Sequence, residues 1–345
     1  MPQIHIVNPI EIPDWDAQVL AFPQATVFHS AAWARVLIES YGFKPHYCVK
    51  SDGKALTAIL PLMEVRDVLG RKKAVCLPFS DFCAPLYNEP ADFIEIFTNA
   101  KDAARGRKWR SITLRGNCPF PEDTPTSTSY YRHILRLNAD PDSLLKNFRE
   151  NTRRNIRKAT KCGVTVEFDT SLDAVREFDR LNCLTRKRHG LPPQPMFFFA
   201  KLHELIIARG KGRIALARRN NTVVAAFVFF EFGQTAFYKY GASDDRYNDA
   251  CANYAIMGEA IRTYAGQGHT EFCFGRTEPH HRGLLQFKTG WNATQYLINN
   301  YQFDLGKNAF CKSELSTTGS HNRIFMRMPL PILRLVGRLL YKYIG

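Results

Sequence analysis

The segment from residue 272 to residue 296 combines fixed cations with the end of a strand. It reads FCFGRTEPHHRGLLQFKTGWNATQY, and its apolar first part is expected to form a strand that ends at Gly275 and Arg276. Lys288 follows on the far side of a polar loop. Proteins of the α/β class place their chemistry at such strand ends, and a cation there can stabilise a tetrahedral oxyanion or hold a phosphate. We therefore predict that Lys288 and Arg276 are catalytic.

The segment FYKYG, residues 237–241, is expected to lie in a strand and adds two tyrosines to this chemistry. Strand alternation predicts that Tyr238 and Tyr240 point to one face and that Lys239 points to the other. If the tyrosines line a cleft, their hydroxyls can orient a ligand or relay a proton. If Lys239 lines it, the tyrosines are packing residues. We assign Tyr240 to the catalytic set and Tyr238 to substrate binding.

Six cations lie on one predicted helix, residues 141–161. Two adjacent rows at helical spacing hold Arg149, Arg153 and Arg157, and Arg154, Lys158 and Lys161. Such a helix is self-repelling unless an anion lies nearby. The pattern indicates either a phosphate-rich ligand, such as a nucleotide diphosphate or the acceptor end of an RNA, or a solvated face near carboxylates. As candidates for substrate binding we name Arg153, Arg154 and Arg157.

A second basic segment, NCLTRKRHGLPPQP at residues 182–195, leads into a proline-rich loop. A cationic turn stiffened by proline can clamp a substrate phosphate or carboxylate. The competing interpretation is an exposed loop without a ligand. On the first interpretation Arg186, Arg188 and His189 bind substrate.

Several chemistries lack their signatures. The sequence contains no P-loop, no G-x-G-x-x-G fingerprint and no G-x-S-x-G elbow. His280 and His281 have no third ligand at metal spacing. We therefore predict no metal site and no tightly bound cofactor.

The elements that would position these residues occur in a repeated order. Helix, hairpin, strand, helix and strand are expected over residues 28–116 and again over 196–275. Asp52-Gly53 and Asn220-Asn221 are the two hairpin turns. The repeat predicts a mixed α/β (α+β) fold of two similar domains, each a mixed sheet flanked by helices.

The last predicted element is an amphipathic helix, residues 329–343, with the sequence PLPILRLVGRLLYKY. Leucines and isoleucines occupy one face, and Arg334, Arg338 and Lys342 repeat at every fourth position on another. The helix either docks on the protein or lies on an anionic membrane surface.

Composition limits the class of protein. The chain has 345 residues and a net charge of +15, which attracts phosphates, nucleotides, RNA or anionic lipid headgroups. Its nine cysteines include no C-x-x-C pair, so a disulfide framework is not expected. Neither a signal peptide nor a membrane span is apparent. We predict a soluble, cytoplasmic protein, with peripheral contact at the inner membrane face as the variant that the last helix allows.

The motifs, in their order, resemble those of FemAB-like proteins, including the branch associated with exopolysaccharide and PEP-CTERM protein-sorting systems. The matching segments are RENTRRNIRKA (149–159), TRKRHGLPPQP (185–195), YKYGAS (238–243), NYAIMGEAIR (253–262) and FGRT…LQFKTGW (274–291). The resemblance extends over about 28–305. It implies two GNAT-like domains in tandem, which we place at residues 1–165 and 166–320, followed by a C-terminal helix at 321–345.

The resemblance also implies an activity. FemAB-like enzymes are N-acyltransferases, whose acceptor amine attacks a held ester without a covalent enzyme intermediate. The family's Phe-Lys pair matches Phe287 and Lys288, the lysine stabilising charge near the ester. The implied donor is aminoacyl-tRNA, acyl-CoA or an acyl-carrier protein, which acts as a co-substrate. The implied acceptor is an anionic, small or lipid-linked precursor of the cell envelope, peptidoglycan or exopolysaccharide. Two other interpretations stay open: a non-catalytic protein that binds RNA or another polyanion, and a membrane-surface scaffold of polysaccharide assembly.

Overall fold

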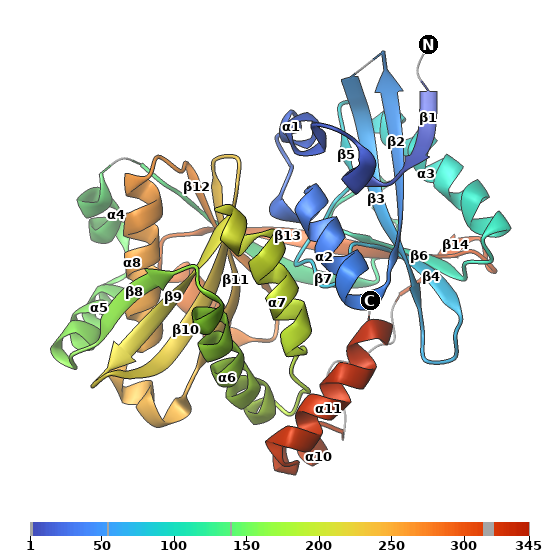
Figure 1. The fold of residues 1–345 in the computed structure, drawn as a ribbon. Coiled ribbons are helices and arrows are strands. Elements are labelled where there is room, and N and C mark those ends of the chain that lie inside the picture. Colours follow the sequence, from blue (N-terminus) through green and yellow to red (C-terminus); the bar gives the residue numbers. More distant parts are fainter. Residues whose placement is uncertain (1–2, 54, 139, 313–320, 345) are drawn as a thin grey trace. The chain divides into compact units, whose positions relative to one another are not determined.

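The chain folds into two units that share one plan, seen in a computed structural model that describes residues 3–53, 55–138, 140–312 and 321–344 (Figure 1). The first unit comprises Met1–Tyr130, Leu297–Leu315 and Leu340–Gly345. The second comprises Tyr131–Tyr296 and Ser316–Leu339.

The first unit is a mixed sheet with the strand order β1-β2-β3-β4-β6-β13, and β5 and β14 pair with β3 and β13. Its elements are β1 (Gln3–Val7), α1 (Trp15–Leu20), α2 (Ala31–Tyr41), β2 (Lys44–Asp52), β3 (Ala55–Arg66), β4 (Lys72–Cys76), β5 (Leu86–Tyr87), α3 (Pro90–Gly106), β6 (Ser111–Arg115), β13 (Thr294–Asp304) and β14 (Ala309–Phe310). Ser30 caps α2 by accepting from the backbone N–H of Trp33, and Gly42 ends it at φ +67°.

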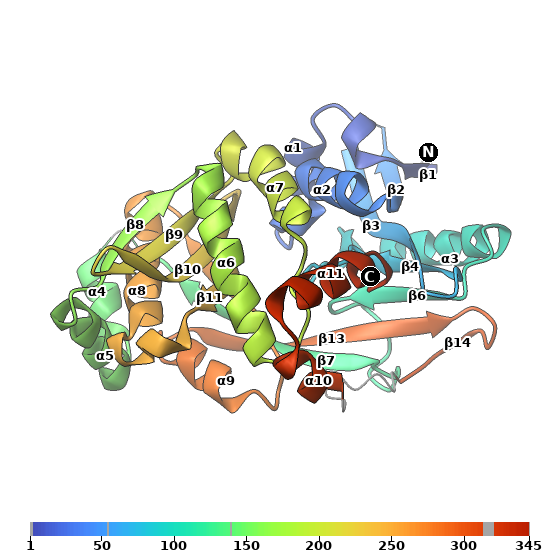
Figure 2. The same ribbon diagram turned by 60° about the horizontal axis from the view of Figure 1, so that its bottom comes forward.

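The second unit is a mixed sheet with the order β7-β12-β11-β10-β9-β8. Its elements are β7 (Thr128–Arg136), α4 (Pro141–Asn147), α5 (Glu150–Lys161), β8 (Thr165–Asp169), α6 (Leu172–Arg188), α7 (Met196–Leu205), β9 (Gly212–Arg219), β10 (Thr222–Phe232), β11 (Thr235–Ser243), α8 (Ala252–Gly266), β12 (Glu271–Thr277), α9 (Arg282–Thr289), α10 (His321–Arg327) and α11 (Leu330–Leu340). Helices α6 and α8 lie on opposite sides of these strands (Figures 1 and 2).

The predicted repeat is confirmed. The series α2-β2-β3-β4-α3-β6 recurs as α7-β9-β10-β11-α8-β12. In each series the first three strands are antiparallel neighbours, and the fourth returns through a helix to lie parallel to the third. The turn residues Asn220 and Asn221 both have positive φ, as the β9–β10 hairpin requires.

The compact units differ from the predicted division at residue 165. Strand β7 precedes that division, yet it pairs antiparallel with β12 in the second unit. Strand β13 follows β12 in the chain, yet it pairs antiparallel with β6 in the first unit. Because these two pairings are non-local, the local helix and strand patterns in the sequence do not reveal them.

The basic helix predicted at 141–161 is two helices. Helix α4 ends at Asn147, and α5 begins at Glu150 after Arg149 turns to φ −55°, ψ 147°. At the break, the ring of Phe148 is buried with its centroid 5.0 Å from that of Trp291. The N–H of Arg149 donates to the carbonyl of Gly290 at 3.0 Å. These two tertiary contacts replace the continuous helix that the sequence favours.

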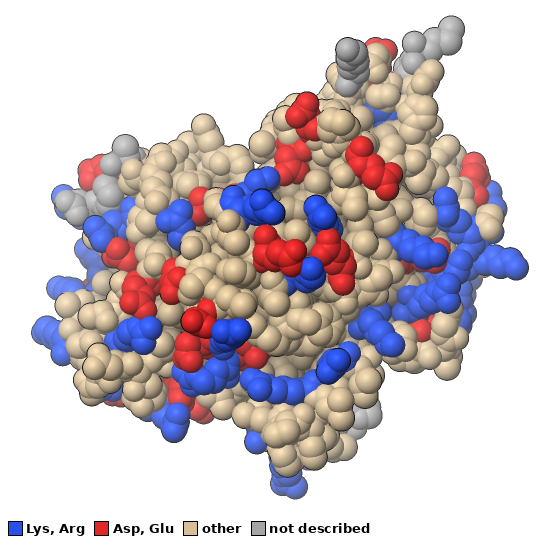
Figure 3. Space-filling model, in the orientation of Figure 1, with Lys and Arg blue, Asp and Glu red and all other residues tan. Residues whose placement is uncertain are grey.

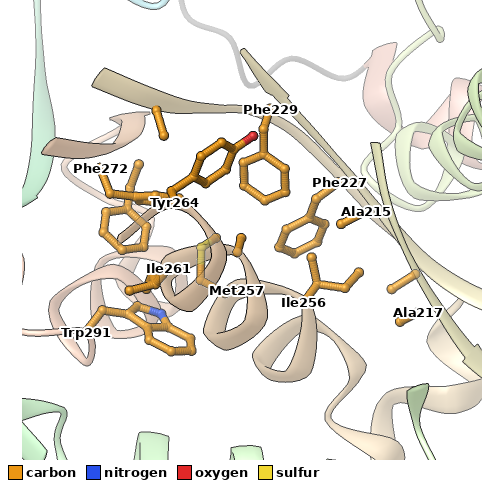
Figure 4. Close-up of a cluster of buried hydrophobic side chains, with 14 of the residues drawn as sticks. Ala215, Ala217, Phe227, Phe229, Ile256, Met257, Ile261, Tyr264, Phe272 and Trp291 are labelled. Carbon is orange, nitrogen blue, oxygen red and sulfur yellow. The ribbon is translucent and has the colours of Figure 1, made fainter. Parts of the chain in front are cut away.

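The core of the second unit lies between the sheet and α8. Phe227, Phe229 and Phe272 project from the strands toward Ile256, Met257, Ile261 and Tyr264 of α8, with Trp291 beside them (Figure 4). Within the described residues, no helix combines the length and the apolar character that crossing a bilayer requires.

Candidate active site

Two parallel strands of the second unit separate at the point where the predicted catalytic residues begin. The paired residues of β11 and β12 run from Thr235 with Glu271 to Phe237 with Cys273. Beyond that register β11 continues to Ser243 and β12 to Thr277. Main-chain groups of the diverging ends therefore need partners other than the neighbouring strand.

Both strands carry a β-bulge just past the separation. In β11, Tyr240 lies opposite Val228 and Tyr238 opposite Phe229, so Lys239 is the extra residue. In β12, the register against β7 shifts between Cys273 and Arg276. A bulge re-aims side chains and interrupts ladder hydrogen bonds.

The bulge at Lys239 overturns the prediction that both tyrosines share one face. Tyr238 packs on Phe227, with ring centroids 4.8 Å apart, on the α8 side of the sheet. Tyr240 packs on Phe178 of α6 and Phe199 of α7, on the other side. The extra residue reverses the alternation, so the two hydroxyls serve different faces.

Lys288 occupies the last turn of α9, and its amine is bound to the bulge in β12. The Nζ donates to the carbonyls of Gly275 at 3.2 Å and Arg276 at 3.0 Å. The residue is only 2% exposed, and Gly275 has φ +67°. The result is a buried cation, held in position by two carbonyls beside the diverging strands.

The side chain of Arg276 lies away from that amine. Arg276 is opposite Arg132 in the register, and His133 is the next residue of β7. Strand alternation therefore places the Arg276 guanidinium on the other face from His133 and the Lys288 amine. The two predicted cations meet through the Arg276 carbonyl and not through a shared cluster of side chains.

His133 is a buried member of this site that the sequence interpretation missed. It is fully buried, and its Nε2 lies 3.1 Å from the amide oxygen of Gln295. An amide oxygen only accepts, so Nε2 carries the proton and Nδ1 keeps a lone pair. Within the described part of the chain, that Nδ1 and the hydroxyl of Thr277 are buried without hydrogen-bond partners. Both positions can accept a hydrogen bond from a ligand.

Two causes lower the pKa of His133 to about 4, burial being the larger and the positive charge of Lys288 the second. The imidazole is therefore neutral at neutral pH. The sequence signal for this residue is its position in the strand YYRHILR. It lies two residues before Leu135, so strand alternation puts both side chains on the face that meets the core. Its proximity to Lys288 depends on the β7–β12 pairing.

This lowered pKa predicts a pH dependence of stability. Above pH about 6.5, the ordinary histidine value, neither state binds the proton. Between pH about 6.5 and 4 the unfolded state binds the proton and the folded state does not. The free energy of unfolding therefore decreases as the pH is lowered through this range, by up to about 3 kcal/mol for this group. His133→Gln should flatten that fall, as measured by urea unfolding at several pH values. The exposed His5→Gln serves as control, and an equal slope in wild type and His133→Gln would contradict the assignment.

The segment FKTGW packs α9 against both α8 and α5. Phe287 and Trp291 contact the ring of Tyr254 in α8, with centroids 5.1 and 5.9 Å away. A Cβ on Gly290 would come within 2.4 Å of the Thr152 hydroxyl. Phe287, Gly290 and Trp291 thus fix the helix whose last turn carries Lys288.

The predicted basic residues lie on two elements. On α5, Arg154 and Arg157 are exposed, whereas Arg153 is half-buried. At the end of α6, the Nε of Arg186 donates to the carbonyl of Pro192 at 3.3 Å, and Arg188 lies 3.9 Å from Asp245. Lysines and arginines are spread over much of the face in Figure 3.

The pKa of His189 is lowered, first by partial removal from water and then by the charges of Arg188, Arg186 and His281. His189 and His281 are far apart in the sequence, but in the fold the charge of His281 acts on the pKa of His189.

A groove of about 550 Å³ lies between α6, the proline-rich loop and α11. At its wall, Arg334 binds the buried carboxylate of Asp179 at 3.1 Å and the thiol of Cys183 at 3.1 Å. Burial raises the pKa of Asp179, and the charge of Arg334 opposes that shift. Lys288 is not among the lining residues. No three His, Cys, Asp or Glu side chains of the described chain are grouped as metal ligands.

Comparison with known proteins defines the class. Residues 146–289 match the protein-family profile described as "Acetyltransferase (GNAT) domain". This match supports the prediction of an acyltransferase for the matched segment.

A particular relative narrows the similarity. The chain is 26% identical over 131 residues to the UDP-N-acetylmuramoylpentapeptide-lysine N(6)-alanyltransferase of Weissella viridescens. The alignment covers 37% of this chain and 38% of that relative, so the chain spans well under half the length of the curated relative it matches.

Solved structures extend the likeness to the whole fold. FemX has a TM-score of 0.68 at 15% identity, covering 89% of this chain and 98% of its own. A tandem GNAT protein from the clavulanic acid biosynthesis pathway has a TM-score of 0.53 at 10% identity, covering 89% and 99%. With these neighbours and the repeated strand order, the predicted tandem GNAT-like fold is confirmed.

Proposed function

We propose that the protein transfers an acyl or aminoacyl group to the amine of a cell-envelope or exopolysaccharide precursor by direct attack of that amine. The observation that carries the proposal is the buried Lys288 cation, bound to the bulge of β12 where β11 and β12 separate. A fixed cation in a dry site stabilises the negative charge that develops on an ester carbonyl under attack.

The other residues take supporting roles. Phe287 holds α9 in place by packing, and the ends of β11 and β12 beyond their paired residues are proposed to contact the donor or the acceptor. Tyr238 and Tyr240, being on opposite faces, contribute to different parts of the site. Arg276 faces away from the Lys288 amine, where it can bind an anionic part of a substrate.

The basic surface favours a polyanionic donor. Aminoacyl-tRNA, acyl-CoA and acyl-carrier protein all carry negative charge. We propose that the donor's phosphates bind to α5, through the exposed Arg154 and Arg157 and the half-buried Arg153. Arg186, Arg188 and His189 are proposed to hold an anionic, small or lipid-linked acceptor. Aminoacyl-tRNA, acyl-CoA and acyl-carrier protein are cytoplasmic molecules, so we propose that the reaction takes place in the cytoplasm. The branch linked to exopolysaccharide and PEP-CTERM systems is proposed from the motifs alone.

The decisive experiment is a donor panel. The purified protein is incubated with alanyl-tRNA, acetyl-CoA or an acylated carrier protein, each with UDP-N-acetylmuramoyl-pentapeptide or an amino-sugar nucleotide as acceptor. Mass spectrometry then detects an acceptor that has gained the acyl group. We expect one donor to give product with wild type and none with Lys288→Met. Salt-sensitive RNA binding, without transfer from any donor, would favour the non-catalytic polyanion-binding alternative.

A further inference from the structure

The C-terminal helices α10 and α11 carry an exposed apolar stripe. Five large hydrophobic side chains of these helices are 46–61% exposed, namely Ile324, Met326, Ile332, Leu335 and Leu339. On α11, Ile332, Leu335 and Leu339 recur at spacings of three and four residues and so form one row.

This row is not the face by which α11 attaches to the protein. Leu333 is fully buried, and a Cβ on Gly337 would lie 2.1 Å from the carbonyl of Pro193. Arg334 adds an ion pair to Asp179 of α6 at 3.1 Å. Figure 2 shows α11 beside α6. The helix is therefore anchored along one side, and the Ile332–Leu335–Leu339 row stays exposed, with Leu335 also lining the groove beside the proline-rich loop.

Charge selects the partner of the outer surface. Residues 321–345 contain five lysines and arginines and no aspartate or glutamate. At 100° of turn per residue, Arg338 lies next to the apolar row, and Lys342 follows in the 3-10 turn Tyr341–Tyr343. Arg334 is bound to Asp179 and is not counted among these outer cations. In Figure 3 the surface over these helices is largely tan with blue side chains at its margins. Apolar side chains beside cations, without acidic groups, match the interface of an anionic bilayer.

We infer that α10 and α11 form a membrane-docking surface, whose apolar row enters the headgroup region of an anionic lipid bilayer while its cations bind the lipid phosphates. Helix α11 has eleven residues, too few to span a bilayer. The segment therefore lies on the membrane. This inference stands on residues that the proposed transfer does not use.

The test is flotation of the full chain with lipid vesicles. Wild type should float with vesicles of phosphatidylcholine and phosphatidylglycerol, and salt should weaken the binding. Vesicles of phosphatidylcholine alone should retain little protein. The triple variant Ile332→Gln, Leu335→Gln, Leu339→Gln should bind at least about tenfold more weakly, because the inserted apolar area is lost. Arg338→Gln with Lys342→Gln should weaken binding about fivefold for each cation removed.

A matched control replaces exposed apolar residues elsewhere. Val68 and Leu69 are 66% and 70% exposed in the first unit, so Val68→Gln with Leu69→Gln should float like wild type. Equal binding to neutral vesicles, or no difference among the variants, would overturn the inference. It would also be overturned by a stable dimer in solution that only the triple variant breaks, since the row would then be covered by a second copy. Thermal unfolding of each variant verifies that it is folded.

Discussion

Lys288→Met should lower the turnover number for acyl transfer by at least about 100-fold, the loss typical when one preorganised donor to a developing oxyanion is removed. The Michaelis constant should change little, because the cation acts on charge that appears only in the transition state. The measurement is steady-state kinetics with the donor identified by the panel.

Stability has to be measured beside the kinetics, since the amine also binds two carbonyls of β12. Loss of these bonds is expected to cost about 1–3 kcal/mol, which urea unfolding reports. Lys288→Arg keeps the charge and should recover part of the rate. Lys307→Met removes an exposed cation that lies outside the residues assigned to the site, and it controls for net charge. Unchanged turnover in folded Lys288→Met would refute the role that we propose for this residue.

Trp291→Ala should destabilise the protein by about 3–5 kcal/mol, as expected for truncation of a large aromatic in a packed core. Trp291 is fully buried among Phe148, Tyr254 and Phe287. It therefore closes the contact between the break before α5 and the helix that carries Lys288. Chemical denaturation measures the change.

The matched variant is Tyr296→Ala, which removes an aromatic ring that is 41% exposed in the same unit. It should cost less than about 1 kcal/mol. A similarly small effect of Trp291→Ala would mean that the contact between α5 and α9 is formed without this ring. Transfer activity of Trp291→Ala, measured well below its unfolding midpoint, then shows whether Lys288 still holds its position.

The repeat was predictable because residues close together in the sequence indicate where its helices and turns begin and end. Ser30 and Gly42 delimit α2, and the Asn220-Asn221 turn joins β9 to β10. Each of these signals acts within a few residues, so hydrophobic periodicity and turn residues are sufficient to detect the repeat.

The site was harder to predict because its geometry depends on single-residue irregularities. One additional residue in β11, Lys239, moves Tyr238 and Tyr240 to opposite faces, and nothing in the letters FYKYG marks the bulge. His133 joins Lys288 only through the pairing of β7 with β12. The motif predicted a role for Lys288, but it gave no sign that the amine would bind the main chain of the strand end.

The placement of β7 and β13 has a consequence for how the polypeptide acquires its structure. During synthesis from the N-terminus, β6 emerges long before residues 294–304, which supply its neighbour β13. The edge of β6 that pairs with β13 therefore stays unpaired, or is protected, while nearly two hundred further residues are synthesised. Cutting the gene at the middle of the sequence would separate both strands from their partners, so the two halves are expected to mature as one cooperative product of the whole chain.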